Sequence, residues 1–180
     1  MRVGISGTPG TGKTTLARRV SDMTGISHVD VSSLAKEKGW VLAHDKARQT
    51  DIVDEIRVRA HVARYADVLI DAHYAELFEC DIVFVVRCPP PTLMARLLAR
   101  GYSREKVKEN VMSEMVDACL AGAVEAVGKE RTYEVLQAAP DAMARAVTAL
   151  IQRPDPSLSV LNRRTAHYLT TRNLDLLQRC

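Results

Sequence analysis

Residues 7–14 read GTPGTGKT and fit the pattern G-x-x-x-x-G-K-[ST] at every position. An apolar run, Val3 to Ile5, precedes the glycines, and helical spacing of apolar residues begins after Lys13. A strand, a glycine-rich turn and a helix in this order form the loop that binds the phosphates of a nucleoside triphosphate. The glycines permit backbone conformations that a Cβ atom forbids, so successive N–H groups can point at phosphate oxygens. A glycine turn that matches by chance is the less favoured alternative, because both flanking elements are present.

Three polar side chains at the end of this loop predict ATP and Mg²⁺ binding. Lys13 is expected to reach the β- and γ-phosphates and to act in catalysis, and the hydroxyl of Thr14 is expected to bind Mg²⁺. Thr15 follows and could hold the α-phosphate. The helix that starts near Lys13 adds the partial positive charge of its N-terminus to the same place.

A second acidic group is expected at the end of a neighbouring strand, to hold Mg²⁺ or its water. Asp71 ends the apolar run Val68–Ile70 and is the candidate, whereas Asp81 precedes a strand. An acid at a strand end is also common in turns and helix caps, and this alternative stays open. His73 lies two residues further on and could orient water or a phosphate, although an isolated histidine is more often a surface or core residue.

Arginine residues suggest a second group of phosphate contacts. A guanidinium matches phosphoryl oxygens better than an ammonium does. Arg87 ends the apolar run Ile82–Val86, at the edge of a parallel sheet where ligands bind, so we expect it to contact substrate.

Three further arginines are spaced four residues apart around Gly101: Arg96, Arg100 and Arg104. A glycine hinge with such charges is typical of a loop that closes over phosphates. The alternative is a solvated helix face with Glu105 and Glu109 as partners, and for Arg96 we favour this alternative.

Composition indicates one globular domain. Of the 180 residues 47% are hydrophobic and 26% charged, which disfavours a disordered chain. No apolar run approaches the roughly 18 residues of a membrane span, and the start MRVGISG does not resemble an export leader. The cysteines, which lack the spacing of a zinc site, are Cys80, Cys88, Cys119 and Cys180. We therefore expect a cytoplasmic protein with reduced thiols.

Short apolar strands alternate with helices along the chain. Strands are expected at 3–5, 27–31, 68–70, 82–86 and 132–136. Helices are expected from 13, at 34–38, from 51, at 93–100, from 103 as one long helix, and at 140–151. Residues 39–50 are expected to be irregular. This alternation predicts an α/β fold, a three-layer sandwich whose parallel sheet is covered on both faces.

The tail from residue 153 carries the whole charge excess. The chain has 25 basic and 22 acidic residues, and the tail alone has five basic and two acidic ones. A nucleic-acid-binding arm would use Arg163, Arg164, Arg172 and Arg179 around Tyr168. A helix docked on the core or on a second subunit would use Leu158, Leu161, Leu169, Leu174 and Leu177. We favour the docked helix, because an excess of three charges is modest.

These motifs together resemble the adenylate kinase isoenzyme 6 family, especially its shorter archaeal members, from about Val3 to about Met115. The segments that carry the resemblance are GTPGTGKTT at 7–15, VDEI at 53–56 after Asp45 and Arg48, VLIDAH at 68–73, IVFVVR at 82–87 and RGYSREKVKENV at 100–111. Chance similarity is disfavoured, because the matches occur in order and at the family's spacing.

The resemblance implies a nucleoside monophosphate kinase core, a P-loop NTPase domain over residues 1–152 whose five parallel strands lie in the order 2-3-1-4-5. It implies the reaction ATP + AMP → 2 ADP with Mg²⁺, accompanied by ATPase activity. The segment 30–50 would bind the monophosphate and 103–113 would form a lid. By this resemblance the ATP-binding residues are Gly10, Gly12, Lys13, Thr14, Thr15, Arg100 and Arg104. The residues for substrate are Asp45, Arg48, Asp54 and Arg87, and the catalytic ones are Lys13, Asp71, His73 and Arg104, with Thr14 and Asp71 at the metal.

The family also implies a role in maturing small-subunit ribosomal RNA, through a small-subunit ribosomal protein. An ATPase that acts on a pre-ribosomal particle is therefore the alternative to a kinase. The two differ in whether residues 30–50 bind AMP or a protein. In that segment Lys36 replaces an arginine of the eukaryotic members. We favour the kinase, because the chain is short and shows no further domain.

Overall fold

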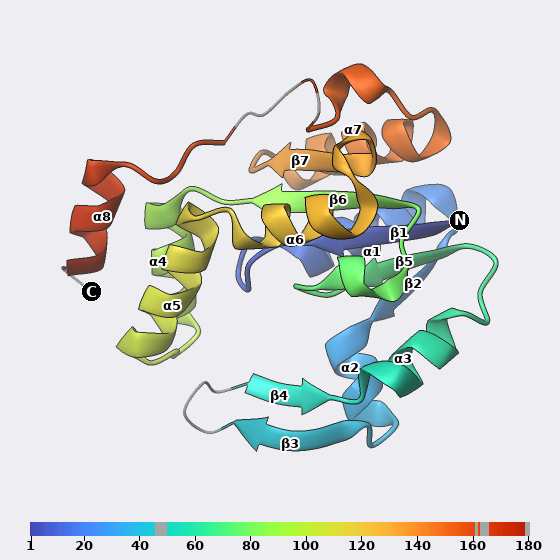
Figure 1. Ribbon diagram of the computed structural model, residues 1–180, viewed down its shortest axis with the longest axis horizontal. Helices are drawn as coiled ribbons and strands as arrows, with labels where there is room; N and C mark the ends of the chain where they lie inside the picture. Colours follow the sequence, from blue (N-terminus) through green and yellow to red (C-terminus); the bar gives the residue numbers. More distant parts are fainter. Residues whose placement is uncertain (46–49, 161, 163–165, 179–180) are drawn as a thin grey trace.

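A five-stranded parallel sheet forms the centre of the protein (Figure 1). The computed structural model describes residues 1–45, 50–160, 162 and 166–178. The strands are β1 (Arg2–Ser6), β2 (Ser27–Asp30), β5 (Val68–Asp71), β6 (Ile82–Arg87) and β7 (Thr132–Leu136). The central strands β1, β5 and β6 are buried almost throughout, as expected where helices cover both faces of a parallel sheet.

The strand order is β2-β5-β1-β6-β7, whereas the prediction reads 2-3-1-4-5. The labels differ because the prediction counts five strands and the described chain contains two more between β2 and β5, but the neighbours in the main sheet are the same. These two strands, β3 and β4, pair with each other in a separate sheet. The carboxyl ends of β1, β2 and β5 meet at one edge, since Asp30 and Asp71 are register partners and Ile5 lies opposite Asp71.

Helices cover both faces of the sheet and produce the three layers. On one face α1 (Lys13–Thr24) packs against α7 (Pro140–Gln152), and their apolar residues join those of β1, β6 and β7 in one core cluster. On the other face lie α2 (Val31–Glu37), α3 (Glu55–Val62) and α6 (Ala118–Val127), with the turn η1 (Ala75–Phe78). A shorter turn, η2 (Lys129–Arg131), leads into β7.

A hairpin of β3 (Val41–Asp45) and β4 (Thr50–Val53) projects below the sheet in Figure 1. The prediction of an irregular 39–50 segment, followed by a helix from residue 51, was therefore wrong. Helix α3 starts later because the side chain of Asp54 caps it by accepting a hydrogen bond from the Arg57 N–H at 3.1 Å. The backbone N–H of Asp54 also donates to the carbonyl of Trp40 at 2.8 Å, which closes the base of the hairpin.

Two helices extend beyond the carboxyl edge of the sheet: α4 (Pro90–Ala99) and α5 (Arg104–Met115). Gly101, with φ of 76°, turns the chain between them. The single long helix predicted from residue 103 was wrong, because Asp117 adopts a left-handed conformation (φ 59°) between α5 and α6. Apolar residues at four-residue spacing continue across this break, so the spacing alone did not reveal it.

The tail contacts the start of the edge strand β7 and ends on the α4–α5 pair (Figure 1). After η3 (Pro156–Leu158) the N–H of Val160 donates to the carbonyl of Thr132 at the start of β7, at 2.8 Å. Helix α8 (Thr171–Gln178) contacts α4 and α5, where Tyr168, Leu176 and Leu177 join a third apolar cluster. The predicted docking of a tail helix is thus observed, and Leu177 packs as predicted. The other described leucines of that prediction, Leu158, Leu169 and Leu174, are exposed. Leu161, Arg163, Arg164 and Arg179 lie outside the described residues. Within the described ranges no helix is long and apolar enough to cross a membrane.

Candidate functional site

The loop between β1 and α1 has the geometry of a phosphate cradle. Gly7 has φ of 137°, and a Cβ atom there would lie 2.6 Å from the carbonyl oxygen of Val86. Gly12, with φ of 105°, caps α1 in a left-handed conformation, and nothing lies within 4 Å of the place where its Cβ would be. The first residues of α1 line the cleft described below, so the N-terminus of this helix is placed to bind an anion.

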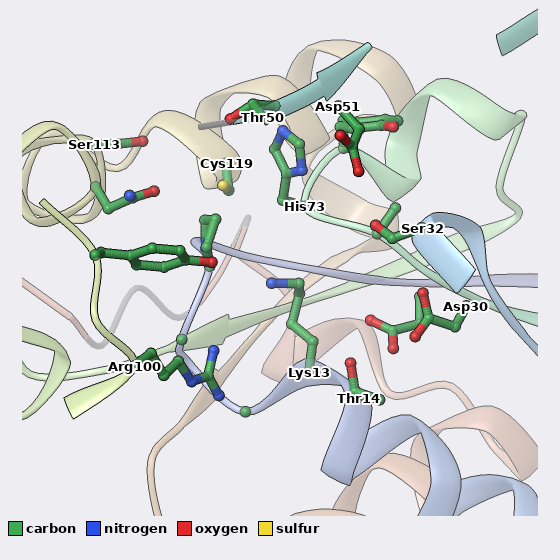
Figure 2. A pocket seen from close by; sticks show the side chains of 18 of the residues that line it. Lys13, Thr14, Asp30, Ser32, Thr50, Asp51, His73, Arg100, Ser113 and Cys119 are labelled. Atoms are coloured by element: carbon green, nitrogen blue, oxygen red, sulfur yellow. The ribbon is translucent and has the colours of Figure 1, made fainter. Parts of the chain in front are cut away.

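Lys13 projects from the first turn of α1 into this space, between Arg100 and Asp30 in Figure 2. Its Nζ donates a hydrogen bond to the carbonyl oxygen of Thr8 at 3.0 Å. Burial lowers the pKa of Lys13 from its ordinary value, and the negative charge of Asp71 opposes that shift. The amine is thus held over the loop, at the place where phosphate oxygens would bind.

A cleft of about 680 Å³ extends from the loop to the hairpin. Its phosphate end contains the predicted ATP-binding residues Gly10, Gly12, Lys13, Thr14, Thr15 and Arg100. The carboxyl edge of the sheet contributes Asp30, Asp71 and His73. The α4–α5 pair contributes Tyr102, Lys106, Glu109, Asn110 and Ser113, and the opposite end is lined by Ser32, Lys36, Thr50, Asp51 and Tyr74. The structure thus brings most of the predicted site residues together in one cleft.

Asp71 lies at the bottom of the cleft, with 3% of its surface exposed. Its Oδ2 atom is 3.4 Å from Nε2 of His28 on the neighbouring strand. Within the described part of the chain, neither atom makes a hydrogen bond. The hydroxyl of Thr14 and the carboxylate of Asp30 line the same part of the cleft. Two oxygen-bearing side chains beside an unbonded buried carboxylate oxygen are suited to a hard divalent cation.

His73 stands on the wall of the cleft above Lys13 in Figure 2. Its carbonyl accepts a hydrogen bond from the Ser6 hydroxyl at 3.1 Å, which fixes the chain after β5. Although the side chain is exposed to the cleft, desolvation and the positive charges of Lys13 and Lys106 together lower the pKa of His73 to about 4. At neutral pH the imidazole is therefore uncharged and can both donate and accept a hydrogen bond.

The hairpin end of the cleft is organised around Asp51. Its carboxylate lies 2.7 Å from Nδ1 of His44 and 3.2 Å from Nζ of Lys36. Hydrogen bonds from His44 and Lys36 hold the pKa of Asp51 below its usual value. Lys36 is thereby held at the edge of the cleft, although its side chain is 65% exposed.

Several predicted site residues do not line the cleft. Arg104 is exposed at the first position of α5, and Lys106 faces the cleft instead. Asp54 caps α3, and Asp45 ends β3 without lining the cleft. Arg48 lies outside the described residues.

Arg87 is the largest departure from the sequence-based assignment of substrate contacts. Its side chain is 1% exposed, and it bonds three carboxylates: Glu114 at 2.8 Å, Asp117 at 2.6 Å and Glu134 at 2.6 Å. The ring of Tyr168 covers it, with 5.1 Å from the guanidinium carbon to the ring centre. A position at the end of a strand predicts contact with ligand, but Glu114 and Asp117 at the α5–α6 junction bond to this guanidinium instead.

Arg96 also differs from its predicted solvated position. Its Nη1 donates to Oε1 of Gln137 at 2.9 Å and lies 3.4 Å from the carbonyl oxygen of Gly10. The sequence reasoning also missed His28, Lys106, Glu114 and Cys119 near the cleft. The register of β2 against β5 could have identified His28, since it stands two residues before Asp30 on the strand next to Asp71.

The chain resembles known proteins in sequence and fold. A family model described as an AAA domain matches residues 3–117. A curated protein named "Putative adenylate kinase" from Halobacterium salinarum is 40% identical over 154 residues, which cover 84% of this chain and 90% of that protein. A protein of the same name from Pyrococcus furiosus is 37% identical over 127 residues, which cover 69% of each chain.

Solved structures of kinases share the fold. A shikimate kinase from Bacteroides thetaiotaomicron superposes with a TM-score of 0.61 at 14% identity, covering 84% of this chain and 98% of that one. A shikimate kinase from Acinetobacter baumannii in complex with shikimate gives a TM-score of 0.57 at 15% identity, covering 86% of this chain and 95% of that one. At this identity the likeness concerns the α/β fold alone. The domain match and the archaeal relatives agree with the motifs quoted above. The chain therefore belongs to the adenylate kinase isoenzyme 6 family of P-loop proteins.

Proposed function

We propose that the protein is a nucleoside monophosphate kinase that transfers the γ-phosphoryl group of ATP to AMP. One observation carries this proposal: the cleft is continuous from the P-loop to the hairpin. It therefore offers a triphosphate end and a second end, about 680 Å³ in all, where an acceptor can lie beside the γ-phosphate. The names of the archaeal relatives support a kinase that acts on nucleotides.

The phosphate end supplies positive charge where the triphosphate would lie. The backbone N–H groups of the loop and the N-terminus of α1 bind phosphate oxygens, and Lys13 reaches the β- and γ-phosphates. In this role the phosphate oxygens replace the carbonyl of Thr8 as the partner of the Lys13 amine. Arg100 and Lys106, which line the cleft from the α4–α5 pair, add charge on the opposite side.

Thr14 and Asp71 would hold Mg²⁺, with Asp30 beside them. The fit rests on the oxygen donors of these side chains and on the buried, unbonded Oδ2 of Asp71. Proteins usually hold Mg²⁺ through one or two carboxylates together with substrate phosphates. When bound, the ion neutralises charge that develops on the phosphoryl oxygens.

The hairpin end would bind the acceptor phosphate. Lys36 is positioned there by Asp51 and offers the ammonium group, while Ser32 and Thr50 offer hydroxyls. In the transfer, a phosphate oxygen of AMP attacks the γ-phosphorus as the bond to the β–γ bridging oxygen breaks, and two ADP molecules result. Lys13 stabilises the transferred group between the two sites, and the neutral imidazole of His73 orients it by a hydrogen bond.

The test is a coupled assay of ADP formation with Mg²⁺-ATP and each of AMP, GMP, CMP and UMP, together with a control without acceptor. Faster ADP formation with AMP than without an acceptor supports the proposal. Lys13→Met is expected to abolish transfer. Lys38→Met is the matched control, because Lys38 pairs with Glu37 and does not line the cleft. Equal rates with every acceptor and with none would contradict the kinase.

An ATPase that acts on a small-subunit ribosomal particle is the second candidate. One observation favours it: Leu42, Ile52 and Ile56 are 66%, 50% and 81% exposed on and beside the hairpin, which suits contact with a macromolecule. The same assay separates the two candidates, since such an ATPase would release ADP at a rate independent of the monophosphate present.

A further inference from the structure

Glu114 connects the α4–α5 pair to the phosphate loop. It lies in the last turn of α5 with 2% of its surface exposed. Oε2 of Glu114 accepts a hydrogen bond from the hydroxyl of Thr8 at 2.5 Å. Oε1 accepts from Nε of Arg87 at 2.8 Å and from the N–H of Cys88 at 3.1 Å. One carboxylate thus joins the P-loop, the end of β6 and the base of α5.

Thr8 in turn connects Glu114 to the catalytic lysine. Its carbonyl oxygen accepts hydrogen bonds from Nζ of Lys13 at 3.0 Å and from the hydroxyl of Thr11 at 2.9 Å. Thr8 is 1% exposed, so its hydroxyl is directed to Glu114 and away from the phosphates. The backbone of Thr8 therefore lies between the carboxylate that anchors α5 and the amine that would bind the γ-phosphate.

Helix α5 is anchored at one end and lines the cleft along its length. Lys106, Asn110 and Ser113 lie about one turn apart and line the cleft, whereas Glu114 points to the sheet. At the other end, Gly101 has a positive φ, and nothing lies within 4 Å of the place where its Cβ would be. The cleft-lining face is thus held by the apolar packing of α5 on α4 and, at the end nearest the P-loop, by the hydrogen bonds of Glu114.

We propose that Glu114 is a positioning residue for phosphoryl transfer, which acts through Thr8 to hold the P-loop and the lining face of α5 in one arrangement. The inference rests on the proposed kinase function for its kinetic readout. In such a transfer the protein itself forms no covalent bond and acts by positioning and charge, so small displacements of the surrounding groups reduce the rate strongly. Glu114 does not line the cleft, so ATP can still bind through the loop backbone when the connection is lost.

The test compares Thr8→Val, Glu114→Gln and the double variant. Thr8→Val keeps the side-chain shape and removes the hydroxyl. Glu114→Gln keeps an acceptor for Arg87 but replaces the charged acceptor of the Thr8 hydroxyl by an uncharged amide, which weakens the connection. Each single change is expected to lower kcat about tenfold or more, with KM for ATP changed less than about threefold. Because both changes act on the same connection, the loss in the double variant should be smaller than the product of the two single losses.

Thr132→Val is the matched control. Thr132 is fully buried and its hydroxyl donates to the carbonyl of Gly128 at 2.8 Å, away from the cleft. The Thr132→Val variant should show a lowered Tm, as Thr8→Val does, but should keep the wild-type kcat. A kcat for Thr8→Val and Glu114→Gln within twofold of wild type, or multiplicative losses in the double variant, would overturn the proposal.

Hydrogen exchange provides a readout that does not need an acceptor. In the wild-type protein, addition of a non-hydrolysable ATP analogue should slow amide exchange along α5, and in Glu114→Gln this protection should be lost while the analogue still binds. If no monophosphate accepts phosphate from the wild type, the proposed kinase function fails, and the exchange result alone decides on Glu114. Equal protection in both proteins would overturn the positioning role.

Discussion

His28 and Asp71 face each other at the carboxyl edge of the sheet, with 3.4 Å between Nε2 and Oδ2. Both atoms are buried, and neither makes a hydrogen bond within the described part of the chain. Buried polar atoms normally have partners, so this pair indicates a place where a further group binds. The pair lies beside Thr14 and Asp30, at the bottom of the nucleotide cleft.

Asp71→Asn should reduce phosphoryl transfer about a hundredfold or more, because an amide oxygen without charge is a poorer ligand for the cation that stabilises the transferred group. The half-saturating Mg²⁺ concentration should rise as well. Asp81→Asn is the control: its carboxylate accepts the N–H of Arg2 at 2.7 Å away from the cleft, and an amide oxygen can still accept. Steady-state kinetics at varied Mg²⁺ would contradict this assignment if the two variants behaved alike.

Gly7→Ala should abolish tight ATP binding. A residue other than glycine at φ of 137° costs about 1–3 kcal/mol, and its Cβ would also meet the carbonyl oxygen of Val86 at 2.6 Å. The loop must therefore shift. Gly25→Ala provides the comparison, since Gly25 has φ of 73° with open space around the Cβ position and lies at the far end of α1. It should cost about 1–2 kcal/mol of stability and leave ATP affinity unchanged. Calorimetric titration with ATP distinguishes the two changes.

The stability of the protein should depend on pH through His73. Its pKa in the folded protein is about 4, below the ordinary 6.5. Between these pH values the unfolded chain binds a proton that the folded protein does not, so stability decreases as the pH falls through this range. Above about 6.5 both states are neutral, and His73 adds no pH dependence. His73→Asn should lack this decrease, so its Tm should rise relative to wild type between pH 7 and pH 5. A constant difference in Tm would contradict the lowered pKa.

Tyr168→Ala should loosen the tail from the α4–α5 pair. The ring covers the Arg87 guanidinium at 5.1 Å and packs with the apolar cluster of these helices. Loss of a desolvated cation–π contact costs about 2 kcal/mol, and loss of apolar contact adds to it. Tyr168→Phe keeps the ring and should remain close to wild type. Urea unfolding gives the free energies, and equal losses for the two variants would show that the hydroxyl, not the ring, stabilises the tail.

The nucleotide end of the site could be predicted from sequence because its chemistry is local. The phosphate loop consists of the consecutive residues 7–14, and Asp71 is the last residue of an apolar run that is recognisable as a strand. Lys13, Thr14 and His73 therefore line the cleft as expected. The same holds for the strands of the main sheet, whose apolar runs are buried on both faces.

The remaining features depend on contacts between distant residues. Asp117 breaks the predicted long helix, and its carboxylate bonds to Arg87, which stands 30 positions earlier in the chain. The hairpin is held by Asp51, which pairs across strands with His44, in a segment too polar to read as a strand. Arg87 was assigned to substrate because nothing in its own neighbourhood reveals the carboxylates that surround it.

The position of the tail on α4 and α5 has a consequence for how the protein is made. Residues up to Val127 contain every described residue that lines the nucleotide cleft, whereas the residues that cover α4 and α5 lie at 166–178. At roughly 5–20 residues per second, synthesis needs several seconds to pass from one to the other. During that interval the apolar surface of these helices has no cover from the tail, and α1 gains its packing partner α7 only once residues 140–152 have been made.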